Sequence, residues 1–249
     1  MISLEVCANS FHSAIAAQEG GAIRVELCDN FQEGGTTPSF FQIELTRQSI
    51  EIELNTIIRP RGGDFFYTDC EFEIMKRDIR SCGNLECDGV VFGILNKDGS
   101  VDKKRNKELI DIARQYNLNA TFHRAFDRSK NLFESLEDII QLGFDHILTS
   151  GGKQTAPEGK EILRQLIEQA AGRITIMPGG GITENNINEL AKYTGLKEFH
   201  GSFRSRIKSQ MEYISPEFNT EDEYSILQTD ADKVRKAIKN ANQTEDENK

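Results

Sequence analysis

Two short stretches near the start of the chain share one alternating pattern of apolar and polar residues. Residues 4–7 read Leu, Glu, Val, Cys, and residues 25–28 read Val, Glu, Leu, Cys. Side chains alternate between the two faces of a strand, so the Glu and Cys of each stretch share a face. If the two strands are parallel neighbours in register, two carboxylates lie below two thiols. Neighbouring strands lie about 4.8 Å apart, so we expect the sulfurs of Cys7 and Cys28 to meet.

The rest of the chain repeats one order, a strand followed by a helix. The hydrophobic pattern predicts strands over residues 2–7, 24–28, 53–59, 88–92, 120–123, 146–149, 173–177 and 197–200. It predicts helices over residues 11–19, 38–49, 70–81, 103–116, 132–142, 160–171, 184–193 and 230–240. This order predicts a single α/β domain over residues 1–240, a (β/α)₈ TIM barrel with a parallel eight-stranded core. A doubly wound open sheet is the alternative, but residues 8–10 lack the glycine-rich first turn of that fold.

Two segments do not follow this pattern. Residues 205–228 have no clear periodicity, and a structureless segment of this length is unusual in a compact domain. We interpret it as a lid, an oligomer contact or a surface wrap. Residues 241–249 form an acidic, polar tail that we expect to be disordered.

The composition argues against several classes of protein. The formal net charge of −10 is unlike that of nucleic-acid-binding proteins, which neutralise phosphates with clustered Lys and Arg. No apolar run approaches the ~20 residues that span a bilayer, and no basic and apolar leader opens the chain. We therefore expect a cytoplasmic protein without membrane or nucleic-acid partners. Five cysteines without a CxxC pair also argue against a disulfide scaffold and a zinc finger.

The inward-facing thiols and carboxylates are the first candidate site, because the carboxyl ends of barrel strands form the active face. Cys7 and Cys28 have three interpretations: ordinary packing, a redox pair, or ligands of a soft metal such as Cu(I). His123 or His200 could add an imidazole nitrogen to such a metal. Glu5 and Glu26 lie one layer deeper and need partners when buried. Their expected partners are Arg59 and Arg61, which share the inward parity.

A second set of residues at the strand ends suggests acid–base chemistry and anion binding. His123 and His200 titrate near neutral pH, with Asp127 or Glu26 as orienting partners, and these four are the candidate catalytic residues. No predicted strand ends in a lysine, which argues against a Schiff-base mechanism. Glycine-rich loops expose backbone N–H groups to anions. The candidate anion-binding residues are Arg59, Arg61, Ser150, Gly151, Gly152, Gly179, Gly180, Gly181, Ser202 and Arg204.

Blocks of sequence along the chain resemble one known family. They are residues 5–7 (EVC), 20–22 (GGA), 25–28 (VELC), 34–39 (GGTTPS), 58–65 (IRPRGGDF), 121–127 (TFHRAFD), 148–152 (LTSGG), 177–182 (MPGGGI) and 198–200 (EFH). Together they resemble the CutC family of copper homeostasis proteins. The resemblance implies a (β/α)₈ barrel, a cytoplasmic location and copper contact by Cys7 and Cys28. Gly201 stands where some members carry a further cysteine.

These observations support three hypotheses of different classes. The first is a copper homeostasis protein that binds Cu(I) through Cys7 and Cys28. The alternative is a TIM-barrel enzyme that acts on a small phosphorylated or carboxylated substrate, and whether the chain catalyses a reaction is left open. A binding scaffold without chemistry would show instead as an apolar patch in residues 205–228. The expected partners are a copper ion or a small anionic molecule, together with further copies of the chain, since such barrels commonly associate.

Overall fold

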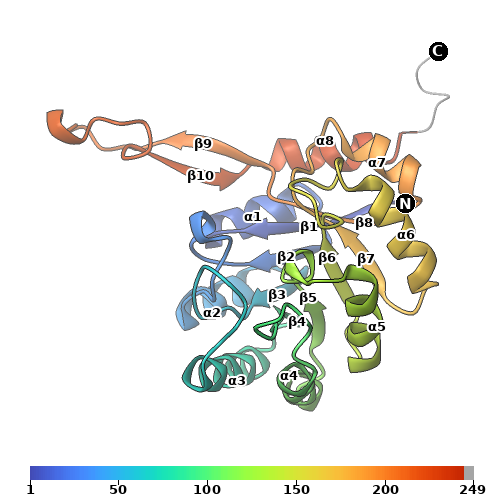
Figure 1. Cartoon of the computed structure of the whole chain (residues 1–249). Coiled ribbons are helices and arrows are strands. Elements are labelled where there is room, and N and C mark those ends of the chain that lie inside the picture. The colour runs from blue at the N-terminus through green and yellow to red at the C-terminus, as the bar shows by residue number, and fades with distance from the viewer. Residues whose placement is uncertain (244–249) are drawn as a thin grey trace.

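In the computed structural model, which describes residues 1–243, eight parallel strands form a barrel surrounded by helices (Figure 1). The strands are β1 (Ser3–Ala8), β2 (Arg24–Leu27), β3 (Glu53–Ile57), β4 (Gly89–Phe92), β5 (Asn119–Phe122), β6 (His146–Thr149), β7 (Thr175–Pro178) and β8 (Glu198–Gly201). The helices are α1 (Phe11–Glu19), α2 (Phe40–Ser49), α3 (Asp69–Asn84), α4 (Lys103–Gln115), α5 (Leu132–Leu142), α6 (Lys160–Ala170), α7 (Ile187–Thr194) and α8 (Ala231–Ala241). The predicted barrel is confirmed. The predicted tail falls largely on residues 244–249, which lie outside the described residues.

The order of the strands distinguishes a barrel from an open sheet. Neighbouring strands run β7-β6-β5-β4-β3-β2-β1-β8, so the first strand pairs with both the second and the eighth. The ends of β7 and β8 also meet, because a Cβ added to Gly179 would lie 3.2 Å from Cδ2 of His200. The doubly wound alternative is therefore wrong.

Polar residues at the predicted helix starts cap the helices of the barrel. The Ser10 hydroxyl accepts from the Ser13 amide at the start of α1, and Ser39 does the same for α2. Thr68 and Glu71 form a capping box at the start of α3. Each cap satisfies a backbone N–H group that the first helical turn leaves without a partner. None of the helices in residues 1–243 is long and apolar enough to cross a bilayer.

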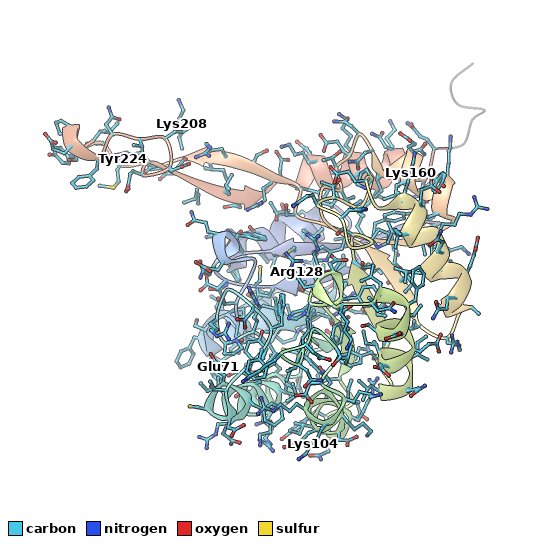
Figure 2. All side chains as sticks on the ribbon, in the orientation of Figure 1. Glu71, Lys104, Arg128, Lys160, Lys208 and Tyr224 are labelled. Carbon is cyan, nitrogen blue, oxygen red and sulfur yellow. The ribbon has the colours of Figure 1, made fainter. Side chains whose placement is uncertain are left out.

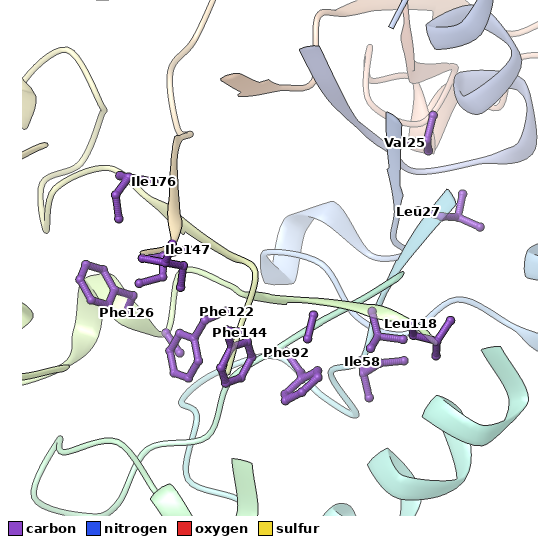
Figure 3. Close-up of a cluster of buried hydrophobic side chains, with 14 of the residues drawn as sticks. Val25, Leu27, Ile58, Phe92, Leu118, Phe122, Phe126, Phe144, Ile147 and Ile176 are labelled. Carbon is purple, nitrogen blue, oxygen red and sulfur yellow. The ribbon is translucent and has the colours of Figure 1, made fainter. Parts of the chain in front are cut away.

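Alternate strand positions separate an apolar outer layer from a polar interior. Outside the barrel, the ring centroids of Phe92 and Phe122 lie 5.1 and 5.2 Å from that of Phe144 (Figure 3). Burying a side chain of this size contributes about 1.5–3 kcal/mol. The inward positions carry polar residues such as Glu5 and Arg24. The outer layer thus provides the apolar burial, and the interior is left to hold charged groups.

The predicted register of the first two strands is wrong. Cys7 lies opposite Glu26, and Glu5 lies opposite Arg24, so β2 is displaced by two residues relative to the expected alignment. Closing a barrel requires tilted strands with a staggered register. The stagger changes which residues lie level with one another while keeping the inward face the same. Glu26 consequently lies beside a thiol instead of beside Glu5.

Residues 205–228, interpreted above as lacking regular structure, form most of a β-hairpin arm. Strand β9 (Arg204–Lys208) pairs antiparallel with β10 (Ser225–Thr229), and a short 3₁₀ turn, η3 (Pro216–Phe218), lies between them. The arm extends away from the barrel and does not wrap it (Figure 1). Lys208 and Tyr224 lie well out along it (Figure 2). The surface-wrap interpretation is therefore wrong, and the pattern was missed because most side chains of both strands are at least partly exposed.

Candidate functional site

A cavity of about 480 Å³ lies at the carboxyl ends of the strands. Its size falls in the usual range for small-molecule sites. Of the candidates from the sequence, it is lined by Cys7, Glu26, Arg59, His123, Gly180, Gly181, His200, Ser202 and Arg204. Cys28, Arg61, Asp127, Ser150, Gly151, Gly152 and Gly179 are not among the residues that line it. The structure therefore brings together the end of β1, the loops after β7 and β8, and the two candidate histidines, His123 and His200.

The two thiols meet as the sequence predicts, although the register differs. The Sγ atoms of Cys7 and Cys28 are 3.5 Å apart, and the Cys28 thiol also lies 3.6 Å from the carbonyl oxygen of Ala8. Both cysteines are free. The hydrogen bond with Cys28 and burial together raise the pKa of Cys7 well above its usual value. Two soft sulfur ligands are thus already side by side below the cavity.

Cys7 also belongs to a mixed cluster of possible ligands. One ligand atom each from Cys7, Glu26 and His200 lies within 4.8 Å of the others. His200 Nε2 is 3.5 Å from a carboxylate oxygen of Glu26. Burial raises the pKa of Glu26, while the charge of His200 and the hydrogen bond with Cys7 act in the opposite direction. Sulfur, nitrogen and oxygen donors therefore meet at one point of the cavity floor.

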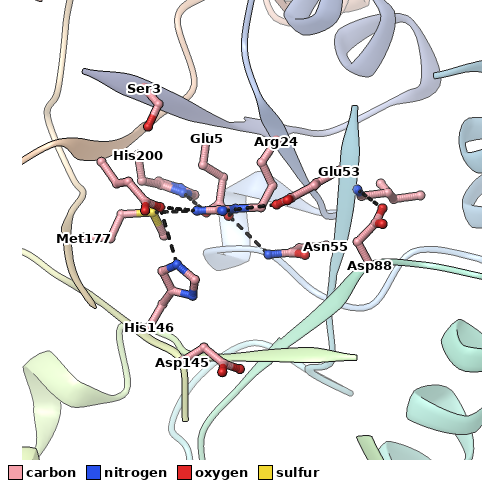
Figure 4. Close-up of polar contacts among 12 residues, drawn as sticks. Ser3, Glu5, Arg24, Glu53, Asn55, Asp88, Asp145, His146, Met177 and His200 are labelled. Carbon is pink, nitrogen blue, oxygen red and sulfur yellow. Dashed lines mark hydrogen bonds and ion pairs between the residues drawn. The ribbon is translucent and has the colours of Figure 1, made fainter. Parts of the chain in front are cut away.

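A buried polar network holds the imidazole ring of His200 in place (Figure 4). Its Nδ1 lies 2.7 Å from Oε1 of Glu5, while Arg24 Nε and Asn55 Nδ2 donate to Oε2 at 2.5 and 3.3 Å. Burial lowers the pKa of His200, but Glu26 and Glu5 outweigh it, so the pKa is raised. The contact with Glu5 fixes the orientation of the ring and leaves Nε2 facing Glu26.

The expected partners of the buried carboxylates are wrong. Arg24, and not Arg59 or Arg61, pairs with Glu5. Arg59 donates to the carbonyl oxygens of Glu33, Gly35 and Gly63 at 2.6 to 2.8 Å, which ties the loops after β2 and β3 together. Arg61 pairs with Asp64 and Glu71. Parity correctly placed Arg59 on the inward face, but it does not give the position along the barrel axis, and Arg61 lies in the loop after β3 outside the cavity lining.

His123 is a neutral imidazole at the cavity wall. The residue is 4% exposed, and burial lowers its pKa to about 3, with help from the charge of Arg59. Its Nδ1 accepts a hydrogen bond from the Ala125 amide at 3.3 Å, so the proton belongs on Nε2. In residues 1–243 that buried Nε2 has no partner. His123 thus offers an unused hydrogen-bond donor.

Asp127 has a different role from the one its sequence position indicates. Its carboxylate accepts from the Ser150 and Gly152 amides and from the Thr149 hydroxyl, and it pairs with Arg124 Nε at 2.7 Å. The loop after β6 therefore binds a carboxylate of its own chain. The Gly151 amide donates instead to the Thr149 hydroxyl.

The CutC family model matches residues 2–205. The chain belongs to the CutC family. The human copper homeostasis protein cutC homolog is 45% identical over 237 residues, which cover 93% of this chain and 86% of that protein. A Bacteroides fragilis family protein CutC is 51% identical over 210 residues, or 84% of this chain and 83% of that protein.

A solved structure of the CutC family supports the same assignment. The crystal structure of the putative copper homeostasis protein CutC from Streptococcus agalactiae matches with a TM-score of 0.77 and 36% identity. The match covers 81% of this chain and 99% of that chain. The resemblance read from the motifs is therefore confirmed. The CutC family model ends where the arm begins, so it covers the barrel strands and leaves out nearly all of the arm.

Proposed function

We propose that this CutC-family protein serves copper homeostasis by binding Cu(I) through Cys7 and Cys28. The observation that carries the proposal is the 3.5 Å separation of their sulfurs, with Cys7 lining the cavity. The names of the human and Streptococcus agalactiae relatives support it. Soft thiolates are preferred ligands of Cu(I), and Glu26 and His200 lie close enough to Cys7 to assist. The copper ion is here the cargo of the protein, and the cytoplasmic location stays a prediction.

Titration with Cu(I) against a competing chelator tests this proposal. We expect Cys7→Ser and Cys28→Ser each to weaken Cu(I) binding by about 100-fold or more, because a hydroxyl is a poor ligand for a soft ion. Cys70→Ser is the matched control, since Cys70 is an exposed free cysteine at the start of α3. The control should bind Cu(I) like the wild type. Equal binding by the wild type and a Cys7→Ser/Cys28→Ser variant would refute the assignment.

The expected association of copies has a candidate surface on the arm. The arm exposes the large apolar side chains of Ile207, Met211, Tyr213, Ile214, Phe218, Ile226 and Leu227. An isolated two-stranded hairpin is marginally stable in water, so a second copy packed on this face would stabilise it. We propose that the arm is the self-association surface. The apolar patch that the scaffold hypothesis expects in residues 205–228 then serves to join copies of the chain.

Light scattering of the purified protein tests the role of the arm. We expect the wild type to have at least twice the mass of one chain and Ile214→Asp/Phe218→Asp to be monomeric, since charge on a buried apolar contact is unfavourable. Glu217→Lys changes the charge between these positions without removing an apolar side chain, so it should associate like the wild type. A monomeric wild-type protein at micromolar concentration would contradict the proposal.

A further inference from the structure

We propose that the cavity also binds a small organic phosphomonoester, with its phosphate at the loops after β7 and β8. This inference goes beyond copper binding and does not depend on it. It starts from the charges that line the cavity. Three arginines, Arg59, Arg124 and Arg204, line it, and Glu26 is the one acidic residue among the lining residues of the described chain.

The phosphate end is defined by backbone donors that have no acceptor. Within residues 1–243, no hydrogen bond uses the N–H groups of Gly180, Gly181, Ile182 or Ser202, and all four residues line the cavity. Gly180 and Gly181 have φ values of +93° and +73°, a conformation that favours glycine. Consecutive free N–H groups in such a loop form a concave site for an anion.

Two guanidinium groups lie beside these amides. A Cβ added to Gly180 would lie 2.9 Å from Nη1 of Arg124, so this guanidinium packs directly on the loop. Arg124 is fixed by Asp127 and Ser150 through its other nitrogens. Arg204 stacks at 4.1 Å on the ring of Phe31 and donates from Nε to the Ser202 hydroxyl. Both cations are thus positioned before any ligand arrives, which lowers the entropy cost of binding an anion.

The remaining part of the ligand must accept hydrogen bonds. His123 Nε2 and Arg59 Nε are buried donors without a partner in the described chain, and both residues are 4% exposed. A buried donor left unsatisfied is costly, so such groups normally have an acceptor. Ile57, Phe65 and Leu148 add apolar surface to the cavity wall. A phosphomonoester with a hydroxyl or carbonyl oxygen on a short carbon chain fits this arrangement, because its two ends can meet both sets of donors.

Calorimetric titration of the full chain distinguishes this proposal from non-specific anion binding. The probes are inorganic phosphate, glycerol 3-phosphate and glycerate. We expect glycerol 3-phosphate to bind most tightly, and Arg204→Gln to weaken it by at least about tenfold through loss of a charge-assisted contact. His123→Phe should weaken glycerol 3-phosphate but leave inorganic phosphate unchanged, since it removes only the second set of contacts.

Two controls keep the interpretation separate from folding and from copper. Arg206→Gln removes a neighbouring arginine of the arm that does not line the cavity, and it should bind like the wild type. Glycerol 3-phosphate should bind the wild type equally well with and without an added Cu(I) chelator. Unchanged affinity in Arg204→Gln, tighter binding of glycerate than of both phosphates, or no binding of any probe at millimolar concentration would overturn the proposal.

Discussion

Replacing Arg24 by methionine is expected to lower the free energy of unfolding by about 3–5 kcal/mol. The Arg24 side chain is 7% exposed and donates to Glu5 at 2.5 Å and to Glu198 at 2.9 Å. Methionine keeps most of the side-chain volume but leaves the fully buried carboxylate of Glu5 without its cation. Removing one partner of a buried ion pair is this costly because the remaining charge is not solvated, and Glu5 would keep only its contacts with His200 and Asn55.

The ion pair between Arg24 and Glu5 also determines whether the free energy of unfolding rises or falls with pH. Burial raises the pKa of Glu5, but Arg24 and His200 outweigh burial and lower the pKa from 4.5 to about 2. A carboxylate whose pKa is lower in the folded protein stabilises the fold at pH values above the unfolded pKa. That contribution is lost as the pH falls toward the folded pKa. The stability difference between the wild type and Arg24→Met should therefore shrink by roughly half between pH 7 and pH 3.

Urea denaturation at both pH values measures these quantities. Arg77→Met is the matched control, because Arg77 is 75% exposed and pairs with Glu73 on the same helix. An exposed pair of this kind contributes about 0.5 kcal/mol or less, so the control should unfold like the wild type. A loss below about 1 kcal/mol for Arg24→Met at pH 7 would contradict the central role of the ion pair.

The fold was predictable because its signals are local. The alternation in residues 4–7 and 25–28 and the caps at Ser10 and Ser39 depend on nearby positions only. The same parity rule placed Cys7 and Cys28 on one face, and their contact at 3.5 Å follows from it. The bounds of α3 and α7 were the least accurate: α3 runs on to Asn84, and α7 begins only at Ile187, after a turn stabilised by Asn186.

The partners within the site were not predictable because they depend on the stagger of the strands. Parity places Arg24 on the inward face together with Glu26, yet only the register shows that Arg24 lies level with Glu5. The presence of a charged residue at an inward strand position was the signal that could have identified Arg24 as a partner of a buried carboxylate. The missing partner of His123 Nε2 is likewise visible only when all neighbouring elements are in place. The residue types at the cavity could therefore be predicted from the sequence, but not which of these residues contact one another.

Replacing Asp127 by alanine is expected to destabilise the protein by about 3–5 kcal/mol, because it removes a buried carboxylate from several donors. The Asp127 side chain is 3% exposed and accepts hydrogen bonds from the loop after β6 while pairing with Arg124. Without it, the Ser150 and Gly152 amides lose their acceptor and Arg124 loses its counter-charge. The sequence suggested that Asp127 orients a catalytic histidine, but in the structure its carboxylate contacts this loop and Arg124.

Two companion variants separate this structural role from a role in binding. Asp127→Asn retains one acceptor oxygen and should lose less stability than Asp127→Ala, whereas Asp111→Ala, at an exposed pair with Lys107, should change it by under about 0.5 kcal/mol. Urea denaturation ranks the three. Because Cys7 lies on β1 and Cys28 directly follows β2, folded Asp127→Asn should bind Cu(I) like the wild type. It should bind glycerol 3-phosphate more weakly, since Arg124 is no longer held. If Asp127→Ala were as stable as the wild type, the carboxylate would not be what holds the loop after β6, and the position of Arg124 beside Gly180 would need another cause.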